Sequence, residues 1–520
     1  MRRYSMPLTC LFALLPVLGL GCSKMEAAAP DYAGGDYYSD SEYAEAPAYE
    51  EAAKSADPSP GYAMADEAAP APTATASAAP VDVGEGVGGM ADMDADGAMM
   101  MEAEAEPAPA PAPAGGRKGG RAKAKMAKKA ESKASSRREA KEAAKIARER
   151  DRVAANIQSG TLTAGSFDDN LNPWVFDRFV DQAMAQPGLS SLAAAFAGPR
   201  TVLRVQDERG RPLGNAKVTI DGKHMTTRSD GRVVWVGGWD SGSQGQGKAT
   251  ISHGNSRKTV QIADQVEQMV TLDGAQASLP SRLDVALVID ATGSMGDELE
   301  YLKVEIRDIA EAINHHFPGV EQRFALVVYR DKGDSYVTRS FDFTTNLDSF
   351  QRDLSEQSAG GGGDYPEAMD AAMAKAAKLS WSKQDAARVT FLVADAPPHQ
   401  DKADDTLAAV DKLRAKGVAV YPVASSGVAG EAEFVMRSAA LLTGAQYLFL
   451  TDDSGVGNPH AEPHIPCYTV EQLAPLMVRA VRSELSGRRV ETEPEFAVRT
   501  VGQGQGGVCA KPRKSKKMAR

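Results

Sequence analysis

The sequence lacks the motifs that most often mark an enzyme. Ser294 stands in Thr-Gly-Ser-Met-Gly and not in the Gly-x-Ser-x-Gly turn of a nucleophile elbow. No histidine is spaced with a serine or cysteine in a recognisable triad pattern. The glycine run 360–363 is not followed by the Lys-Ser/Thr pair of a phosphate-binding loop. These absences predict a protein that is not an enzyme, with no catalytic residue, no nucleotide cofactor and no small-molecule substrate.

Apolar runs long enough to cross a bilayer are also missing. The run 8–20 follows Arg2-Arg3 and is too short for a transmembrane helix, so it is typical of an export signal. The next residues, Gly19-Leu20-Gly21-Cys22, resemble a bacterial lipoprotein box, with Gly19 in place of the usual aliphatic residue. The resemblance implies a lipoprotein signal over 1–22 and a lipid on Cys22 that anchors the chain in the cell envelope, in a leaflet that stays open. Ordinary cleavage nearby is the alternative.

Cysteine is scarce, with only four residues in 520. Cys10 and Cys22 fall within the export signal, so Cys467 and Cys509 are left for the mature chain. In an oxidising compartment such a pair favours a disulfide bond, and two free thiols are the alternative.

Large aliphatic residues are nearly absent from 23–114, which is acidic and rich in alanine and proline. Such a segment cannot bury enough apolar surface to fold, so a disordered tether is predicted. The next segment, 115–155, is rich in Ala, Lys and Arg and has no aromatic residue. It is expected to be a solvated helix that pairs with the acidic segment, or to contact anionic lipid. Nucleic acid is not expected as a partner of this basic segment, because the chain is expected to be exported. The net charge of -11 is therefore the sum over segments of opposite charge, one acidic and one basic.

The chain changes character at about residue 160. Residues 160–198 contain a short motif and an amphipathic helix. Residues 200–275 alternate short apolar strands with turns, which predicts a small antiparallel β-sandwich. The stretches 205–213, 216–218 and 227–231 are similar to the carboxypeptidase regulatory-like family. That similarity implies a structural or interaction module without an active site.

Residues 281–487 alternate apolar strands with helices. The strands are expected at 283–289, 324–329, 336–343, 389–394, 418–423 and 446–450, and a closing helix at 470–485. This order predicts an α/β fold with a mainly parallel, doubly wound sheet between helices. Residues 502–520 are rich in glycine and then basic, and are expected to form an unstructured tail apart from Cys509.

Oxygen-bearing side chains follow the first of these strands. Asp290, Thr292 and Ser294 lie between a strand and a helix, where open α/β sheets bind their ligands. The spacing brings alternate side chains to one side of the loop, and hard oxygen donors suit Mg²⁺, Ca²⁺ or Mn²⁺. Two later stretches supply further acids, Asp364 after the glycine run and Asp395 after a buried strand.

These three stretches read DATGSM, GGGGDYPEA and FLVADAPPH, in that order. Together they resemble a von Willebrand factor type A (VWA) domain with its metal-ion-dependent adhesion site (MIDAS). The resemblance implies that a divalent cation is bound by Asp290, Thr292, Ser294, Asp364 and Asp395. Asp364 stands where adhesive members commonly have threonine. Either the ion is then held tightly and captures acidic ligands weakly, or Asp364 stands back from it.

We therefore expect an envelope-anchored lipoprotein that binds protein partners through a MIDAS-like divalent-metal site. The alternative is a structural or assembly protein of the envelope that uses the VWA domain as a metal-free scaffold. Two nearby acids are expected to have structural roles: Asp331 to begin a turn, with support of the site as the alternative, and Glu367 to cap a helix. A second group of residues matches no standard zinc spacing and is expected to form a loop, with a transition-metal site as the alternative: Asp452, Asp453, His460, His464 and Cys467.

Overall fold

The computed structural model describes residues 161–512, except 242–246, 264, 364, 429, 456–459, 461–462 and 464. The predicted signal, tether, basic segment and lipidation of Cys22 lie outside the described residues, and so does Asp364. Within the described part, none of the helices combines the length and the apolar character that a membrane span requires.

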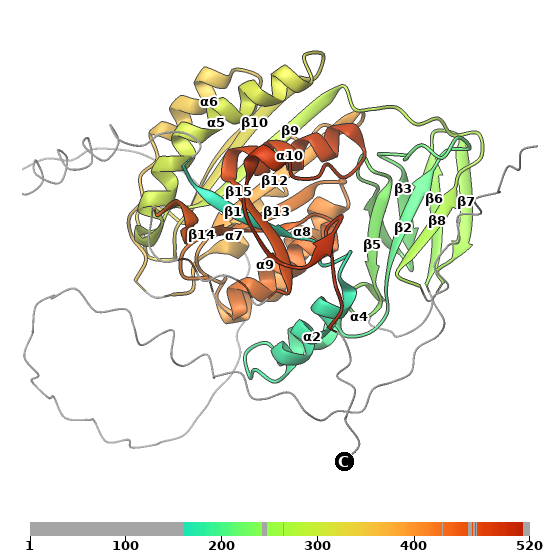
Figure 1. Cartoon of the computed structure of the whole chain (residues 1–520), viewed down its shortest axis with the longest axis horizontal. Coiled ribbons are helices and arrows are strands. Elements are labelled where there is room, and N and C mark those ends of the chain that lie inside the picture. Colours follow the sequence, from blue (N-terminus) through green and yellow to red (C-terminus); the bar gives the residue numbers. More distant parts are fainter. Residues whose placement is uncertain are drawn as a thin grey trace, which may run out of the picture. The chain divides into compact units, whose positions relative to one another are not determined.

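A nine-stranded sheet forms the centre of the α/β region (Figure 1), in the order β11-β10-β9-β12-β13-β14-β1-β15-β16. Five neighbouring strands are parallel, as the alternating pattern predicted: β10 (Glu321–Tyr329), β9 (Arg282–Asp290), β12 (Ala386–Ala394), β13 (Ala419–Ala424) and β14 (Tyr447–Thr451). Antiparallel strands complete both sides: β11 (Thr338–Thr344), β1 (Thr163–Phe167), β15 (Cys467–Gln472) and β16 (Ala497–Gly502).

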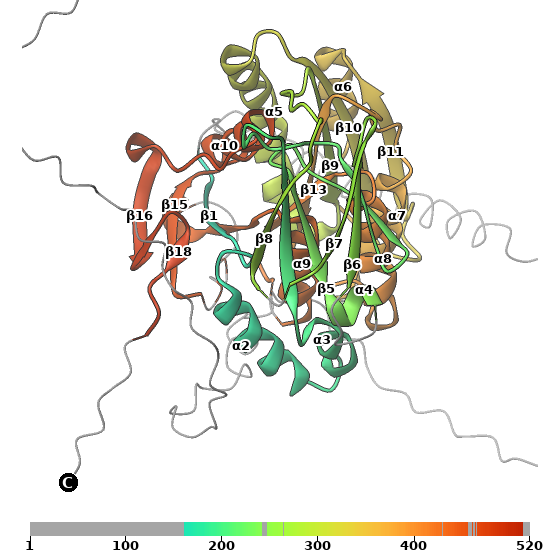
Figure 2. The same cartoon turned by 90° about the vertical axis from the view of Figure 1, so that its right-hand side faces the viewer.

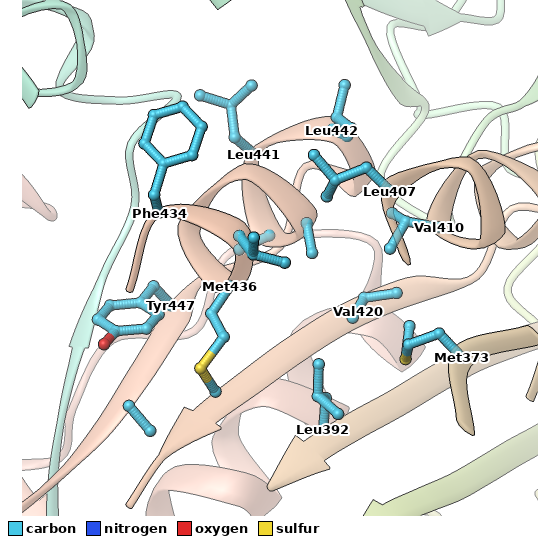
Figure 3. Close-up of a cluster of buried hydrophobic side chains, with 14 of the residues drawn as sticks. Met373, Leu392, Leu407, Val410, Val420, Phe434, Met436, Leu441, Leu442 and Tyr447 are labelled. Atoms are coloured by element: carbon cyan, nitrogen blue, oxygen red, sulfur yellow. The ribbon is translucent and has the colours of Figure 1, made fainter. Parts of the chain in front are cut away.

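Helices cover both faces of this sheet. One face packs against α5 (Gly296–His316), α6 (Leu347–Ser355) and α10 (Leu473–Ser486). The other packs against α7 (Met369–Ala376), α8 (Ala403–Arg414) and α9 (Glu431–Thr443). Figure 3 shows part of this second core, where Leu407 and Met436 lie over Leu392 and Val420 of the strands. Apolar residues at helical spacing on the helices and continuous apolar runs in the strands produce this two-sided burial.

The strand order reverses at β9. The chain continues from β9 through α5 to β10 on one side, and returns later to β12 on the other. The loops after β9 and β12 therefore diverge at the carboxyl edge of the sheet, which is where ligands bind in open α/β sheets.

The segment before the sandwich contributes more than the expected motif and helix. Residues Thr163–Phe167 form β1, inserted between β14 and β15, before α2 (Pro173–Met184) and α3 (Ser190–Phe196). A Cβ at Gly165 would lie 2.3 Å from the Phe449 ring, so only glycine fits there. The pairing depends on strands almost 300 residues away, which no local pattern reveals.

The C-terminal region also differs from expectation. The predicted helix 470–485 is preceded by β15, and residues after 487 form β16 and the hairpin of β17 (Gly504–Gln505) and β18 (Val508–Cys509). The prediction of an unstructured tail is wrong for 502–509. A disulfide bond joins Cys467 to Cys509 and attaches this hairpin to β15.

Residues 200–272 form two small sheets that enclose a separate core. One sheet contains β5 (Arg232–Val236), β2 (Arg200–Gln206) and β8 (Glu267–Thr271). The other contains β4 (Lys223–Thr226), β3 (Lys217–Ile220), β6 (Lys248–His253) and β7 (Ser256–Gln261). The sandwich is not wholly antiparallel, because β2 and β8 pair in parallel.

The sandwich lies beside the α/β region (Figures 1 and 2). Hydrogen bonds and buried ion pairs join the two. The hydroxyl of Thr226 donates to the carbonyl of Ala415 at 2.6 Å. Arg228 pairs with Glu484 of α10, and Arg414 of α8 pairs with Asp240 of the short helix α4 (Gly237–Ser241). These contacts explain why α8 and α10 end against the sandwich.

Candidate metal site

Three oxygen-bearing side chains converge in the loop after β9. The backbone N–H and the hydroxyl of Thr292 both donate to Asp290 Oδ1, at 2.9 and 2.7 Å. The Thr292 hydroxyl lies 3.4 Å from that of Ser294. Asp290 and Thr292 are buried. The structure therefore brings together three of the predicted ligands, and Asp290 Oδ2 is a buried oxygen without a hydrogen-bond partner within the described chain.

Asp395 approaches the same place from the next strand. It follows β12, which runs parallel to β9 and so ends at the same edge of the sheet. Its side chain is buried, and its Oδ1 has no partner among the residues that the structure describes. The fifth predicted ligand, Asp364, is not described.

The acids of this site raise one another's pKa. Burial raises the pKa of Asp290 to about 7, and the charge of Asp395 adds to the shift. Burial raises the pKa of Asp395 to about 6, although a hydrogen bond with Ser294 opposes that shift. Burial and the nearby carboxylates of Asp290 and Asp331 raise the pKa of Glu367 to about 9. The main causes of these three shifts are burial, neighbouring carboxylates and local hydrogen bonds.

A divalent cation fits this arrangement. Two buried carboxylate oxygens lack partners, two hydroxyls lie beside them, and all four groups are hard donors. In the described part of the chain, no three His, Cys, Asp or Glu side chains converge into a ready-made metal cluster. The hydroxyls of Thr292 and Ser294, water and Asp364 would therefore have to complete the ligand set.

Glu367 differs from its expected role, whereas Asp331 begins a turn, in which the N–H of Asp334 donates to its carbonyl at 3.3 Å. α7 begins after Ala368, and Glu367 is buried beside the glycine-rich loop, where it does not cap the helix. A 2.7 Å hydrogen bond joins Asp331 Oδ1 to Nε2 of His399, which follows Asp395 by four residues. Both acids therefore border the site. Their positions just after the end of a strand or of a loop could have indicated this from the sequence.

A second polar group adjoins the site and was not anticipated. Glu298, on the first turn of α5, accepts a 2.5 Å hydrogen bond from Ser426, which follows β13. His460 Nε2 lies 3.8 Å from Glu298 Oε1, and its Nδ1 lies 2.8 Å from Asp452. Glu298 comes four residues after Ser294, the helical spacing that could have placed it near the metal loop.

The cluster of Asp452, Asp453, His460, His464 and Cys467 does not form one site among the described residues. Asp453 pairs with Arg499 at 2.7 Å, while Asp452 faces His460. Cys467 is disulfide-bonded, and His464 is not described. The expectation of a loop is met by residues 452–455, which form a single 3₁₀ turn and its cap.

Residues 284–444 match the family model described as the von Willebrand factor A domain. Two curated relatives match part of the chain. An ariadne-like RING finger protein of Acanthamoeba polyphaga mimivirus is 30% identical over 186 residues, which are 32% of this chain and 18% of that protein. An alpha-protein kinase, vwkA, of Dictyostelium discoideum is 33% identical over 120 residues, 22% of this chain and 19% of the kinase. The chain thus spans under a fifth of either relative.

Solved structures are similar only at a distance. BatB from Bacteroides thetaiotaomicron, a conserved hypothetical protein, has a TM-score of 0.27 and 15% identity, covering 39% of this chain and 97% of BatB. The proximal thread matrix protein 1 of the mussel byssus, with a zinc-occupied MIDAS motif, has a TM-score of 0.26 and 16% identity, covering 33% of this chain and 41% of that one. Scores this low carry no functional inference.

Proposed function

We propose that the VWA domain at residues 284–444 binds a divalent cation and uses it to bind a protein partner. The observation that carries the proposal is the pair of buried carboxylates, Asp290 and Asp395, each with an unpartnered oxygen at the carboxyl edge of the sheet. Burying like charges together is costly unless a cation lies between them. A divalent ion bound there would supply positive charge and an open coordination position for a donor atom of the partner.

The surrounding acids restrict what that donor can be. Asp290 and Asp395 already face the site, and Asp364, the remaining predicted ligand, would add a third carboxylate. Three carboxylates more than neutralise a divalent ion, so the bound ion attracts an incoming carboxylate weakly. The proposed partner therefore offers a neutral oxygen donor or a basic side chain to this edge of the sheet.

We further propose that the chain is exported and anchored in a bacterial cell envelope through a lipid on Cys22. The disulfide between Cys467 and Cys509 supports export, because such bonds persist in oxidising compartments. Incorporation of labelled palmitate into the parent and not into a Cys22→Ser protein tests the anchor. Equal labelling of the two proteins would contradict it.

We propose no enzymatic activity. The kinase and RING finger names belong to relatives of which this chain matches only 19% and 18%. The described residues around Ser294 place no histidine against its hydroxyl, which contacts Thr292 and Asp395.

Thermal unfolding of the full chain tests the metal site. The protein is measured with EDTA and then with Mg²⁺, Ca²⁺ or Mn²⁺, beside Asp290→Ala and Asp348→Ala proteins. Asp348 is exposed and pairs with Arg307 away from the site, so it controls for the loss of one carboxylate. An ion that binds only the folded form raises the midpoint by mass action. We expect the rise in the parent and in Asp348→Ala, and none in Asp290→Ala.

Partner capture separates the proposal from its alternative. We expect envelope proteins retained by the parent in the active ion to be released by EDTA and not to bind Asp290→Ala. Capture that survives both EDTA and the substitution would instead favour a metal-free scaffold for envelope assembly.

A further inference from the structure

One sheet of the sandwich carries charge of a single sign. Its strands β4, β3, β6 and β7 read KHMT, KVTI, KATISH and SRKTVQ, which together contain five Lys or Arg residues and no Asp or Glu. The whole chain, by contrast, has a net charge of -11. In Figure 1, β6 and β7 lie on the side of the sandwich away from the central sheet. A basic sheet in an acidic chain marks a surface that attracts anions.

Three of the five cations lie on the outer face of this sheet without an acidic partner. Lys223 forms ion pairs with two carboxylates, and Lys258 lies on the core side of β7, where its Nζ donates to a backbone carbonyl at 2.8 Å. Lys217, Lys248 and Arg257 are exposed on the outer face. No ion pair joins any of these three to an acid of the described chain. They can therefore bind an anion without first breaking an existing pair.

A row of hydroxyl groups lies between these cations. Thr219, Thr250 and Thr259 are neighbours on β3, β6 and β7. The hydroxyls of Thr250 and Thr259 lie 3.2 Å apart, and that of Thr219 lies 3.0 Å from His224 Nδ1. The apolar residues of the four strands alternate with these and point into the sandwich core. The outward residues of the four strands can therefore form hydrogen bonds, and they include no apolar side chain and no Phe, Tyr or Trp.

The positions of the three cations suit an extended ligand. Lys217 and Arg257 are both in register with Ser252 of the strand between them, so their backbones lie about two strand spacings, or about 10 Å, apart. Lys248 precedes Ser252 by four residues on β6, a distance of about 13 Å. Burial and the charge of Arg388 lower the pKa of Lys217, so positive charge is uncompensated there. A polymer with repeated anionic groups can pair with all three cations, whereas one small anion would require them to converge against their mutual repulsion.

We propose that this outer face of the sandwich binds an acidic polysaccharide. Carboxylate groups of the polymer pair with Lys217, Lys248 and Arg257, and its sugar hydroxyls form hydrogen bonds with the threonine row. A lipid bilayer is a poorer match, because the outward residues include no apolar anchor. Single-stranded nucleic acid is also a poorer match, because the face has no aromatic side chain of the kind on which bases stack. This proposal does not depend on the metal site, which lies in the VWA domain.

Binding of oligogalacturonate, a carboxylated polysaccharide fragment, tests the proposal. Fluorescence polarisation of the labelled oligomer is measured with the full chain in EDTA, so that no divalent cation contributes. We expect saturable binding that weakens severalfold between about 50 mM and about 300 mM NaCl, and no binding of dextran oligomers. The double variant Lys248→Gln, Arg257→Gln should bind at least about tenfold more weakly, because two charge-assisted contacts are lost. The double variant Thr250→Val, Thr259→Val should bind about threefold more weakly, because it keeps the charges and loses two hydroxyls.

A charge-matched control carries Arg209→Gln and Lys383→Gln, two exposed cations outside this sheet, and should bind as the parent does. Thermal unfolding verifies that each variant is folded, and Asp290→Ala should bind as the parent does, which separates this face from the metal site. The proposal is overturned if the control loses as much affinity as the sheet variant, or if the threonine variant loses none. Tighter binding to phosphatidylglycerol vesicles or to a DNA duplex than to the oligomer also overturns it. If the parent binds no oligogalacturonate, the proposal fails, and the cations only keep the edge strand β7 from pairing with other strands.

Discussion

Asp169 and Asp290 are both buried, but their surroundings are opposite. Asp169 accepts two hydrogen bonds from Arg437, at 3.0 and 2.6 Å, and links the segment after β1 to α9. Asp290 accepts two hydrogen bonds from Thr292 and faces Asp395, and its Oδ2 has no hydrogen-bond partner by distance and angle within the described chain. Within the described chain, Arg437 pairs with the first carboxylate and no arginine pairs with the second.

This difference indicates which buried charges are part of the fold and which await a ligand. Burial alone would drive an arginine such as Arg437 toward neutrality, yet Asp169 and Glu433 reverse the effect and raise its pKa. At the metal loop burial and the neighbouring carboxylate act in the same direction. A charge cluster that the fold leaves uncompensated is a candidate for a cation supplied from outside.

The largest effect should come from breaking the paired site. Asp169→Ala leaves the guanidinium of Arg437 buried with only Glu433 as an acidic partner. We expect the free energy of unfolding to fall by about 3–5 kcal/mol, because an uncompensated buried charge must be desolvated. Urea unfolding followed by circular dichroism measures the change. A loss under about 1 kcal/mol would show that Glu433 alone suffices, and that the two aspartates differ less than the geometry indicates.

Removing a carboxylate at the metal loop should change the free energy of unfolding in the opposite direction. Asp290→Asn removes a carboxylate whose pKa is raised to about 7, so the charged form is disfavoured in the folded protein. In EDTA at pH 8 we expect a gain of about 2–3 kcal/mol in the free energy of unfolding, together with loss of the metal-induced rise. Destabilisation in EDTA would mean that Asp290 has a structural role in the loop and would remove the main support for a cation.

The sequence predicted most of the α/β region because its strands are continuous apolar runs. β9, β10 and β12 correspond closely to runs ending at 289, 329 and 394. β1 was missed because its pairing partners are distant, and the C-terminal hairpin because each of its strands is only two residues long and shows no pattern. Short segments of this kind take their structure from the sheet edge that they join.

Part of the candidate site could be predicted from the sequence because its residues lie close together in one loop. The loop carrying Asp290, Thr292 and Ser294 has a spacing that converges by local geometry alone. Glu298 follows Ser294 at helical spacing and could have been anticipated, whereas Glu367 gains its proximity from the packing of the loop before α7, which residue spacing does not determine. The absence of a countercharge is likewise a property of the folded molecule.

The comparison also predicts a pH dependence. The folded pKa values of Asp290 and Asp395, about 7 and about 6, lie above their ordinary value of 3.8. The folded state therefore binds more protons than the unfolded state between these limits, and the metal-free protein loses stability as pH rises from about 4 to about 7. Between pH 5 and pH 7 the parent should lose about 1–2 kcal/mol more than Asp290→Asn. Parallel stability curves for the two proteins in EDTA would contradict this assignment.

The smallest effect is expected where a carboxylate is neither buried nor opposed by another acid. Asp348 is 81% exposed and lies 2.8 Å from Arg307, which is 44% exposed. Water already solvates both charges, so Asp348→Asn should change the free energy of unfolding by about 0.5 kcal/mol or less, and the change should vanish in high salt. Urea unfolding at 50 mM and 500 mM NaCl measures it beside the Asp169 and Asp290 variants. A change as large as that of the Asp169 or the Asp290 variant would show that loss of any aspartate perturbs this protein. The difference between the paired carboxylate of Asp169 and the facing carboxylates of Asp290 and Asp395 would then not explain the results.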